Sequence, residues 1–308
     1  MGNLISSVTC FIYNGKHFGW DFAYKFRINK RNKEKRNELL QYALSNFFHS
    51  EIQAFKASAY ISNMQSVKKG YVWFFWWQAS KKKELPPVVQ LCYENLVRNM
   101  APMEVIFLNQ NNVANFVDIP DFIWEKLERK EFSLTHFSDI LRFALLNRYG
   151  GIWCDATVLV TEPISKHPEL LQYRLYTQRF YKNKDEVPVS EQEVRRNIAF
   201  GRWAGFFQAT NVVHHPLYVL GEKLFYYYWS KNTQLLDYFL IDHIINLIYK
   251  NIPEVKKDIE SIPVNNKDIF YFIHKPNHIS TKDTYVFKLS WKDPINREEI
   301  KLYRQDRL

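Results

Sequence analysis

The chain has 308 residues, of which 46% are hydrophobic, and it carries a formal net charge of +10 at pH 7. Its length and composition are those of an ordinary soluble protein with one large core. The longest apolar run, Tyr71–Trp77, is far shorter than the roughly 20 residues that span a bilayer, and the N-terminus lacks the layout of a signal peptide. Three cysteines without metal-ligand spacing indicate neither a disulfide framework nor a zinc site. We therefore expect a cytoplasmic protein.

The first part of the chain is predicted to be basic and helical. From Lys35 to Phe55 the apolar residues recur at helical spacing, which predicts an amphipathic helix. Basic residues cluster over residues 27–36 and again over residues 81–83. Such clusters fit a solvated surface, an anionic membrane surface or a nucleic acid. Because no helix-turn-helix, zinc finger or aromatic RNA-binding signature accompanies the charge, we expect no nucleic-acid partner.

After this extension, the predicted strands and helices alternate along the chain. The expected elements are a strand at 71–77, a helix at 86–99, a strand at 104–108, short helices at 113–116 and 121–129, and a long helix at 134–149. This rhythm is typical of an open parallel sheet with helices on both faces. We expect a helical extension over residues 1–68 and one α/β domain over residues 69–308.

The long helix and the segment after it carry the most informative pattern of the chain. Asp139 and Arg142 stand three residues apart, so they share one flank of the helix and can reach the same ligand. Gly150-Gly151 ends the helix, and buried strands are expected on either side of Asp155. A carboxylate in such a position needs a cation, a hydroxyl or an arginine as its partner.

The remainder of the chain is predicted to contain fewer strands. Residues 182–196 are the most polar central segment and are expected to form a loop near the site. The other expected elements are a strand at 200–210, helices at 216–230 and 235–249, and a mixture of loop and strand over the last 50 residues, ending in a basic tail. His214-His215 is expected to begin a helix, because adjacent histidines point in different directions and suit a metal poorly.

These motifs resemble a known family. The pattern S-D-x-x-R, followed after thirteen residues by the first acid of G-G-x-x-x-D-x-T, resembles the bacterial capsular polysaccharide synthesis glycosyltransferases. These are relatives of glycosyltransferase family 32 and, more distantly, of the clostridial glucosylating toxins. The resemblance continues in Val72–Gln78, Asp237–Asp242 and Lys288–Lys292. It implies a GT-A type fold, which is a Rossmann-like, mostly parallel open sheet that binds a nucleotide at the carboxyl ends of its strands.

The resemblance also implies which residues bind a sugar nucleotide. Trp76 would lie against the uracil, although Trp77 is only one residue away and both could instead belong to the core. Ser138, Asp139 and Arg142 would hold the hydroxyls of the donor sugar, with the carboxylate accepting and the guanidinium donating hydrogen bonds. A surface salt bridge on the helix is the alternative for the charged pair.

Asp155 matches the first acid of the family's D-x-D motif, which meets the ribose, the sugar and the metal shell. The second acid, the usual ligand of Mn²⁺ or Mg²⁺, is replaced by Thr157, which removes one full charge from the expected metal site. The resemblance gives Asp155 and Ser290 as the remaining metal ligands. It further implies that Lys288, Ser290 and Trp291 close over the diphosphate, whereas an ordinary edge strand is the alternative there.

The acceptor side is less well defined. By resemblance, Asp237 or Asp242 would orient the acceptor hydroxyl, and helix capping or a pair with His243 is the alternative. We expect a lipid-linked glycan acceptor. Anionic lipid headgroups are then the expected partner of the basic clusters, because each basic residue near the surface contributes about 1 kcal/mol to binding. This would place the protein peripherally on the inner face of the cell membrane.

The function that these features predict is transfer of a hexose from a UDP-sugar to a hydroxyl of a capsular or other cell-surface polysaccharide. The resemblance implies retention at the anomeric carbon. Two alternatives stay open: a toxin-like glycosyltransferase that modifies a protein, and a non-catalytic protein that binds carbohydrate or nucleic acid. The absence of a P-loop, a nucleophile triad and a Rossmann G-x-G-x-x-G argues against other common enzyme classes.

Overall fold

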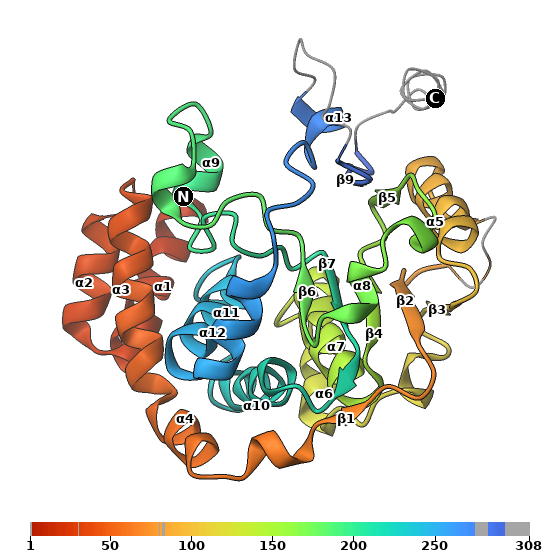
Figure 1. Ribbon diagram of the computed structural model, residues 1–308. Helices are drawn as coiled ribbons and strands as arrows, with labels where there is room; N and C mark the ends of the chain where they lie inside the picture. Colours follow the sequence, from red (N-terminus) through yellow and green to blue (C-terminus); the bar gives the residue numbers. More distant parts are fainter. Residues whose placement is uncertain (1, 30, 80, 82–83, 275–282, 293–308) are drawn as a thin grey trace.

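A computed structural model describes residues 2–29, 31–79, 81, 84–274 and 283–292 of the chain. Its centre is a five-stranded sheet with the strand order β3-β2-β4-β7-β6 (Figure 1). The strands are β2 (Tyr71–Phe75), β3 (Glu104–Leu108), β4 (Gly151–Cys154), β6 (Tyr176–Thr177) and β7 (Phe207–Thr210). β2 is parallel to both β3 and β4, whereas β7 is antiparallel to β4 and to β6. The predicted α/β class is confirmed, with a sheet that is mixed rather than purely parallel.

Helices cover both faces of this sheet, and the alternation of side chains along β2 explains why. Val72 and Phe74 are buried on one face, which α5 (Pro87–Asn99) covers with Val89 and Leu96. Trp73 is buried on the opposite face. The helix α7 (Leu134–Tyr149) packs on that opposite face, and α10 (Pro216–Lys231) packs against α7. Residues 71–75 therefore form a strand that is buried on both sides, as their continuous apolar run predicts, but the strand ends at Phe75 and not at Trp77 as expected.

Two smaller sheets attach to the main one. β1 (Gln65–Ser66) pairs with β8 (Val212–Val213), and β5 (Val158–Val160) pairs antiparallel with β9 (Val286–Lys288). Because β5 follows β4 after only three residues, its pairing with β9 places residues 286–288 near the end of β4. The remaining short elements are α6 (Asp121–Glu128), α8 (Glu169–Gln172), α9 (Gln192–Arg196), α13 (Tyr271–His274) and the 3₁₀ turns η1 (Tyr60–Asn63), η3 (Val113–Asn115), η4 (Ile164–Lys166) and η5 (Lys184–Glu186).

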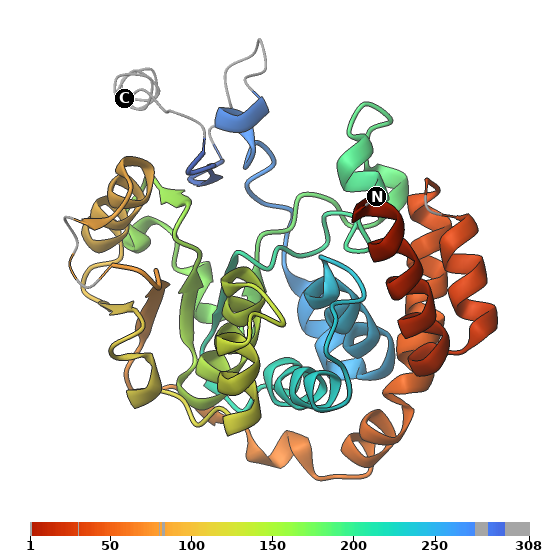
Figure 2. The ribbon, with the colours of Figure 1, turned by 180° about the vertical axis from the view of Figure 1, so that it is seen from behind.

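The N-terminal helices form a separate layer beside α11 (Leu240–Asn251) and α12 (Pro253–Ser261), away from the sheet (Figures 1 and 2). They are α1 (Gly2–Phe18), α2 (Trp20–Ile28), α3 (Lys33–Phe47) and α4 (His49–Lys56). Leu40, Leu44 and Phe48 of this layer belong to the same hydrophobic core as the face of the sheet that α7 covers. Among the described residues, no helix is both long and apolar enough to cross a bilayer.

Several predicted boundaries were wrong. The single helix expected from Lys35 to Phe55 is interrupted near Phe48, which divides it into α3 and α4. The strand expected at 200–210 begins only at Phe207, because Phe200 and Gly201 have positive φ angles of 50° and 72° and form a turn. The helix expected at 235–249 begins at Leu240. The last 50 residues contain the end of α12 and the short helix α13, where only loop and strand were expected, and the basic tail lies outside the described residues.

Two glycines set the geometry at the end of α7, as predicted. Gly150 and Gly151 have φ angles of 64° and 85°, which favour glycine. A Cβ on Gly151 would lie 2.2 Å from the carbonyl oxygen of Tyr71, so only glycine permits β4 to approach β2 this closely. The turn therefore delivers Asp155 directly to the carboxyl end of the sheet.

Candidate functional site

Asp155 lies immediately after β4 and is surrounded by hydrogen-bond donors. Its Oδ1 accepts from Arg142 Nη2 at 3.0 Å and from Trp153 Nε1 at 2.7 Å, and its Oδ2 accepts from Lys288 Nζ at 3.0 Å. Burial favours a higher pKa for Asp155, but the charges of Lys288 and Arg142 and the indole donor outweigh it and lower the pKa. Asp155 is therefore a carboxylate at neutral pH. Its partners include the arginine that was expected for a buried acid at this position.

Arg142 connects this carboxylate to Asp139. The guanidinium is 3% exposed, and its Nη1 lies 3.3 Å from Asp139 Oδ1. It also lies over the ring of Trp153, at 5.1 Å from the centroid. A Cβ on Gly205 would lie 2.8 Å from Arg142 Nη1, so the bare backbone of Gly205 makes room for the guanidinium. The predicted pair on α7 is thus buried and is not a surface salt bridge.

Asp139 differs from Asp155 in its protonation. Burial raises the pKa of Asp139 to about 7, with Arg142 acting in the opposite direction and the charge of Asp155 adding to the rise. The two acids on either side of Arg142 therefore have pKa values shifted in opposite directions. At neutral pH Asp139 can either donate or accept a hydrogen bond, whereas Asp155 can only accept.

Lys288 reaches the site through the pairing of β9 with β5. Val158 is paired with Lys288 in the register of these strands, and the amide of Leu289 donates to the carbonyl of Thr157 at 2.8 Å. The same pairing places the segment after Lys288 beside residues 155–157. Lys288 Nζ lies 5.2 Å from the ring centroid of Phe206. We call Asp139, Arg142, Trp153, Asp155 and Lys288 the Asp155 cluster.

Two tryptophans that follow strands β2 and β9 contact each other. Trp76 follows β2 and makes an edge-to-face contact with Trp291, with ring centroids 6.3 Å apart and an interplanar angle of 79°. Trp291 is 53% exposed, so the pair presents aromatic surface to solvent. Trp77 lies on the opposite side, against Phe137. The structure therefore brings Trp76 and Trp291 together and leaves Trp77 in the core.

The predicted hydroxyl groups make local contacts. Ser138 Oγ donates to the carbonyl of Thr135 at 2.6 Å, within its own helix. Ser290 Oγ accepts from the amide of Lys292 at 3.3 Å. Thr157 contributes its carbonyl to the pairing with Leu289. In the described part of the chain, none of these three hydroxyls is bonded to Asp155.

The donor set does not fit a divalent cation. Among the described residues, no group of three or more histidines, cysteines or acids could hold a metal ion. Both oxygens of Asp155 face cationic side chains, Arg142 and Lys288. Because Mn²⁺ and Mg²⁺ prefer several oxygen ligands with negative charge, one carboxylate paired with Arg142 and Lys288 is a poor site for either.

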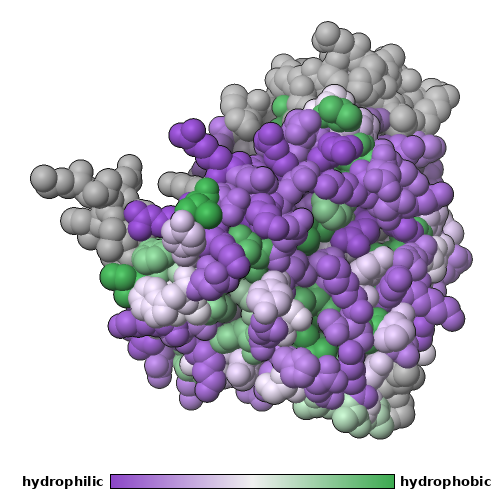
Figure 3. All heavy atoms as spheres, turned by 90° about the vertical axis from the view of Figure 1, so that its left-hand side faces the viewer, coloured by the Kyte–Doolittle hydropathy of each residue, from purple (hydrophilic) through white to green (hydrophobic). Residues whose placement is uncertain are grey.

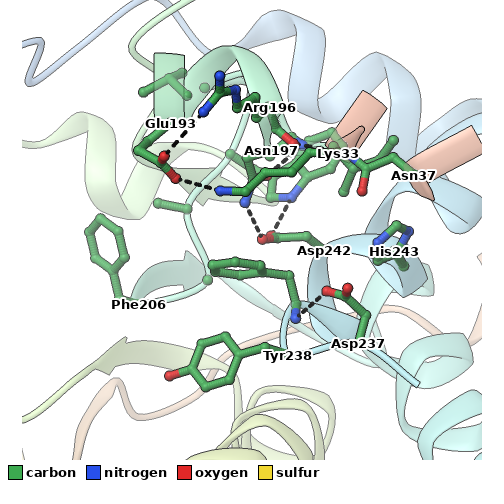
Figure 4. A pocket seen from close by; sticks show the side chains of 18 of the residues that line it. Lys33, Asn37, Glu193, Arg196, Asn197, Phe206, Asp237, Tyr238, Asp242 and His243 are labelled. Atoms are coloured by element: carbon green, nitrogen blue, oxygen red, sulfur yellow. Dashed lines mark hydrogen bonds and ion pairs between the residues drawn. The ribbon is translucent and has the colours of Figure 1, made fainter. Parts of the chain in front are cut away.

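A pocket of about 510 Å³, shown in Figure 4, includes Lys288 of the Asp155 cluster in its lining and therefore adjoins that cluster. Three separate segments supply most of its lining: the first turns of α3, residues 193–206 and residues 237–243; Phe180, Phe270 and Lys288 complete it. Lys33 of α3 and Glu193 of α9 form an ion pair at 3.0 Å, and Asn37 donates to the carbonyl of Arg196 at 2.9 Å. We call this cavity the side pocket. The polar loop expected near the site at 182–196 does line it, through α9.

The two predicted acceptor-side acids both line the side pocket but have different surroundings. Asp242 is buried in α11 and accepts from Asn197 at 3.2 Å and from Trp203 Nε1 at 3.0 Å (Figure 4). Burial raises its pKa, although both donors act to lower it. Asp237 precedes the helix, where it accepts from the amide of Phe239 at 2.9 Å. The expectation that both acids lie on one helix was wrong for Asp237, which forms a turn before α11.

Some residues of the site were not identified from the sequence. Trp153 stands two residues before Asp155. Because residues i and i+2 point to the same side of an extended chain, the sequence could have predicted this contact. Tyr238 and Phe239 line the side pocket and are 58% and 48% exposed. Their exposure, and the approach of α3 to the site, have no local signal in the sequence.

Comparison with known proteins adds one match. The family model described as capsular polysaccharide synthesis protein matches residues 21–306, which is most of the chain. It covers the Asp155 cluster and the lining of the side pocket. A comparison with curated proteins finds no match.

Proposed function

The chain belongs to the capsular polysaccharide synthesis protein family, and from this premise we propose that it is a glycosyltransferase of the GT-A type. It would transfer a hexose from a UDP-sugar to a hydroxyl of a capsular polysaccharide. The observation that carries the proposal is the Asp155 cluster, in which two acids with oppositely shifted pKa values flank a buried arginine at the carboxyl end of a sheet. Charged groups in such a place suit a polar ligand with a diphosphate.

The cationic side chains would compensate the diphosphate of the donor. Lys288 Nζ is the more accessible of the two cations at Asp155, since its side chain is 21% exposed and that of Arg142 is 3% exposed. We assign Lys288 to the diphosphate, where an ammonium group stabilises the negative charge that grows as the leaving group departs. Arg142 and Asp155 would hold the sugar hydroxyls. Trp76 and Trp291 would face the uracil.

The transfer itself needs no covalent enzyme intermediate in this proposal. The bond between the anomeric carbon and the diphosphate oxygen breaks as the bond to the acceptor oxygen forms on the same face. The acceptor hydroxyl proton passes to the departing phosphate oxygen. Positioning and charge stabilisation would supply the rate enhancement, and retention follows from attack on the face that the leaving group vacates.

The side pocket is the proposed acceptor site. It adjoins Lys288, so an acceptor held there would face the reacting carbon of a donor bound at the Asp155 cluster. Tyr238 and Phe239 offer partly exposed aromatic rings for sugar faces, and Asp242 supplies a buried acid. The chain would therefore bind donor and acceptor in two adjoining places with Lys288 between them.

The experiment that tests this function is release of UDP from a panel of UDP-hexoses, with manganese, magnesium or EDTA. The native protein is compared with Asp155→Ala and with Asp21→Ala, a matched loss of an exposed acid on α2 whose side chain is 77% exposed. Release from one donor that is lost only in Asp155→Ala supports the transferase. Donor binding without release in any condition would favour a non-catalytic carbohydrate-binding protein, an idea consistent with the internal pairing of Asp155. Absence of both binding and release would overturn the assignment of the donor site.

A further inference from the structure

An apolar stripe runs along the outer face of α2. Trp20, Tyr24 and Ile28 are 55%, 59% and 61% exposed, and their spacing of four residues places them on one face of the helix. The opposite face already supplies the packing of this helix, since Phe22 and Ala23 are buried. The ring of Trp20 also contacts Phe11 of α1, with centroids 5.8 Å apart, so the apolar surface that the packing of α2 does not use is mainly that of Tyr24 and Ile28. Figure 3 looks at the side that carries α1, α2 and α3 and shows hydrophobic side chains set among hydrophilic ones.

Positive charge accompanies this stripe. Between Lys16 and Arg31 the sequence has five basic residues and one acid, Asp21. Arg27 stands three residues after Tyr24, on the same flank of the helix, and is exposed, as is Arg31 just after the helix. Asp21 is paired with Lys25 at 2.7 Å, so its charge is largely compensated. A partner for this surface must therefore accept aromatic and aliphatic side chains while presenting negative charge.

We propose that the outer face of α2 docks in the plane of an anionic lipid bilayer. Tryptophan and tyrosine favour the boundary between headgroups and acyl chains, and isoleucine partitions into its apolar side. Each exposed basic residue near an anionic surface adds about 1 kcal/mol. A nucleic acid would use the charge but leave the aliphatic end of the stripe in water. This assignment is independent of the proposed sugar transfer.

The test is co-sedimentation of the full chain with vesicles of phosphatidylglycerol mixed with phosphatidylcholine, and with vesicles of phosphatidylcholine alone. We expect binding to the anionic vesicles and binding at least about tenfold weaker to the neutral ones. The double variant Tyr24→Ala/Ile28→Ala removes apolar side chains that make no contact with the core and is expected to bind the anionic vesicles about tenfold more weakly. Arg27→Gln/Arg31→Gln is expected to bind the anionic vesicles about 30-fold more weakly, because it removes two positive charges.

Tyr42→Ala is the matched control, because Tyr42 is 70% exposed on α3, outside the stripe. It should bind the vesicles like the native chain, and thermal unfolding of all variants checks that they fold. Three outcomes would overturn the proposal: equal binding to neutral and anionic vesicles, no binding to either, or equal losses from Tyr42→Ala and Tyr24→Ala/Ile28→Ala. Binding to a duplex oligonucleotide that survives Tyr24→Ala/Ile28→Ala, without vesicle binding, would instead assign the surface to nucleic acid.

Discussion

Around Asp155 the charged side chains contact one another at 3.0 to 3.3 Å, whereas the adjoining side pocket keeps about 510 Å³ open between elements from three parts of the chain. The first region is held by internal ion pairs in a buried setting. The second has a largely apolar lining surface, with an ion pair that is about a quarter exposed at its edge, between Arg36 and Asp237 at 3.7 Å. In the proposed function, the fixed charges lie where the diphosphate of the donor would need compensation. The open space lies where an acceptor glycan would enter.

The largest expected effect is on stability, from Arg142→Met. Removing this guanidinium leaves Asp139 and Asp155 facing each other without it, and breaking a buried ion pair costs about 3–5 kcal/mol. Arg36→Met is the matched change at the side pocket, where the pair is about a quarter exposed and the loss should stay below about 1 kcal/mol. Urea unfolding of both variants measures the difference. Equal losses would remove the distinction between the two regions.

The second prediction concerns the pH dependence of stability. Burial raises the pKa of Asp139 from 3.8 to about 7, so between these values the native state binds more protons at this site than the unfolded state. The contribution of Asp139 is therefore fully present below pH 4 and is lost as the pH rises through about 7. Relative to Asp139→Asn, the native protein should lose at most roughly 1.4 kcal/mol for each pH unit over this range.

The measurement is urea unfolding of the native protein and Asp139→Asn at several pH values. Asp242→Asn is the comparison at the side pocket, where burial also raises the pKa of the acid and a loss of the same sign is expected. A difference between native protein and Asp139→Asn that stays constant from pH 4 to 8 would contradict the raised pKa.

The third prediction separates Lys288 from a metal ion. If Lys288 provides the charge at the diphosphate, Lys288→Met should weaken UDP binding by about tenfold to a hundredfold, which corresponds to about 1.4–2.7 kcal/mol. EDTA should change the affinity of the native protein by less than about twofold. Lys33→Met, which removes a lysine of the side pocket, should leave UDP binding unchanged. Calorimetry measures all three, and abolition of UDP binding by EDTA would assign the role to a metal instead.

The smallest expected effect comes from the aromatic residues of the side pocket. Tyr238→Ala should slow transfer to a glycan about fivefold to tenfold, since a partly exposed ring contributes about 1 kcal/mol to stacking. Slow hydrolysis of the UDP-sugar should persist, because Tyr238 lines the side pocket, which is the proposed acceptor site. Rates of transfer and of hydrolysis, measured in the same samples, provide the test. A parallel fall in both rates would place Tyr238 in the donor site.

The sequence predicted the parts of the site that depend on local spacing. Asp139 and Arg142 face the same way because they lie three residues apart on a helix, and the glycine turn places Asp155 at the end of a buried strand. The role assigned to Lys288 came from family resemblance, and its contact with Asp155 depends on two strands that are 130 residues apart in the chain. Local periodicity contains no information on such a pairing.

The side pocket could not be predicted in the same way. Its walls require α3 to lie against α9 and α11, and these contacts join residues about 160 and 205 positions apart. The apolar residues from Phe200 onward were mistaken for a strand because their composition fits one, but two positive φ angles fold them into a turn that lines the cavity instead. Hydrophobicity alone does not distinguish a strand from a turn packed by distant elements.

The pairing of β9 with β5 has a consequence for the order of events during synthesis. Lys288 follows Asp155 by 133 residues, so Asp155 leaves the ribosome roughly 7 to 27 s before its partner, at typical elongation rates. During that interval the sheet can already form while one oxygen of the carboxylate has no ammonium group beside it. The charge balance of the site is therefore completed late in translation, and a nascent chain that stops before β9 would carry the sheet without a complete Asp155 cluster.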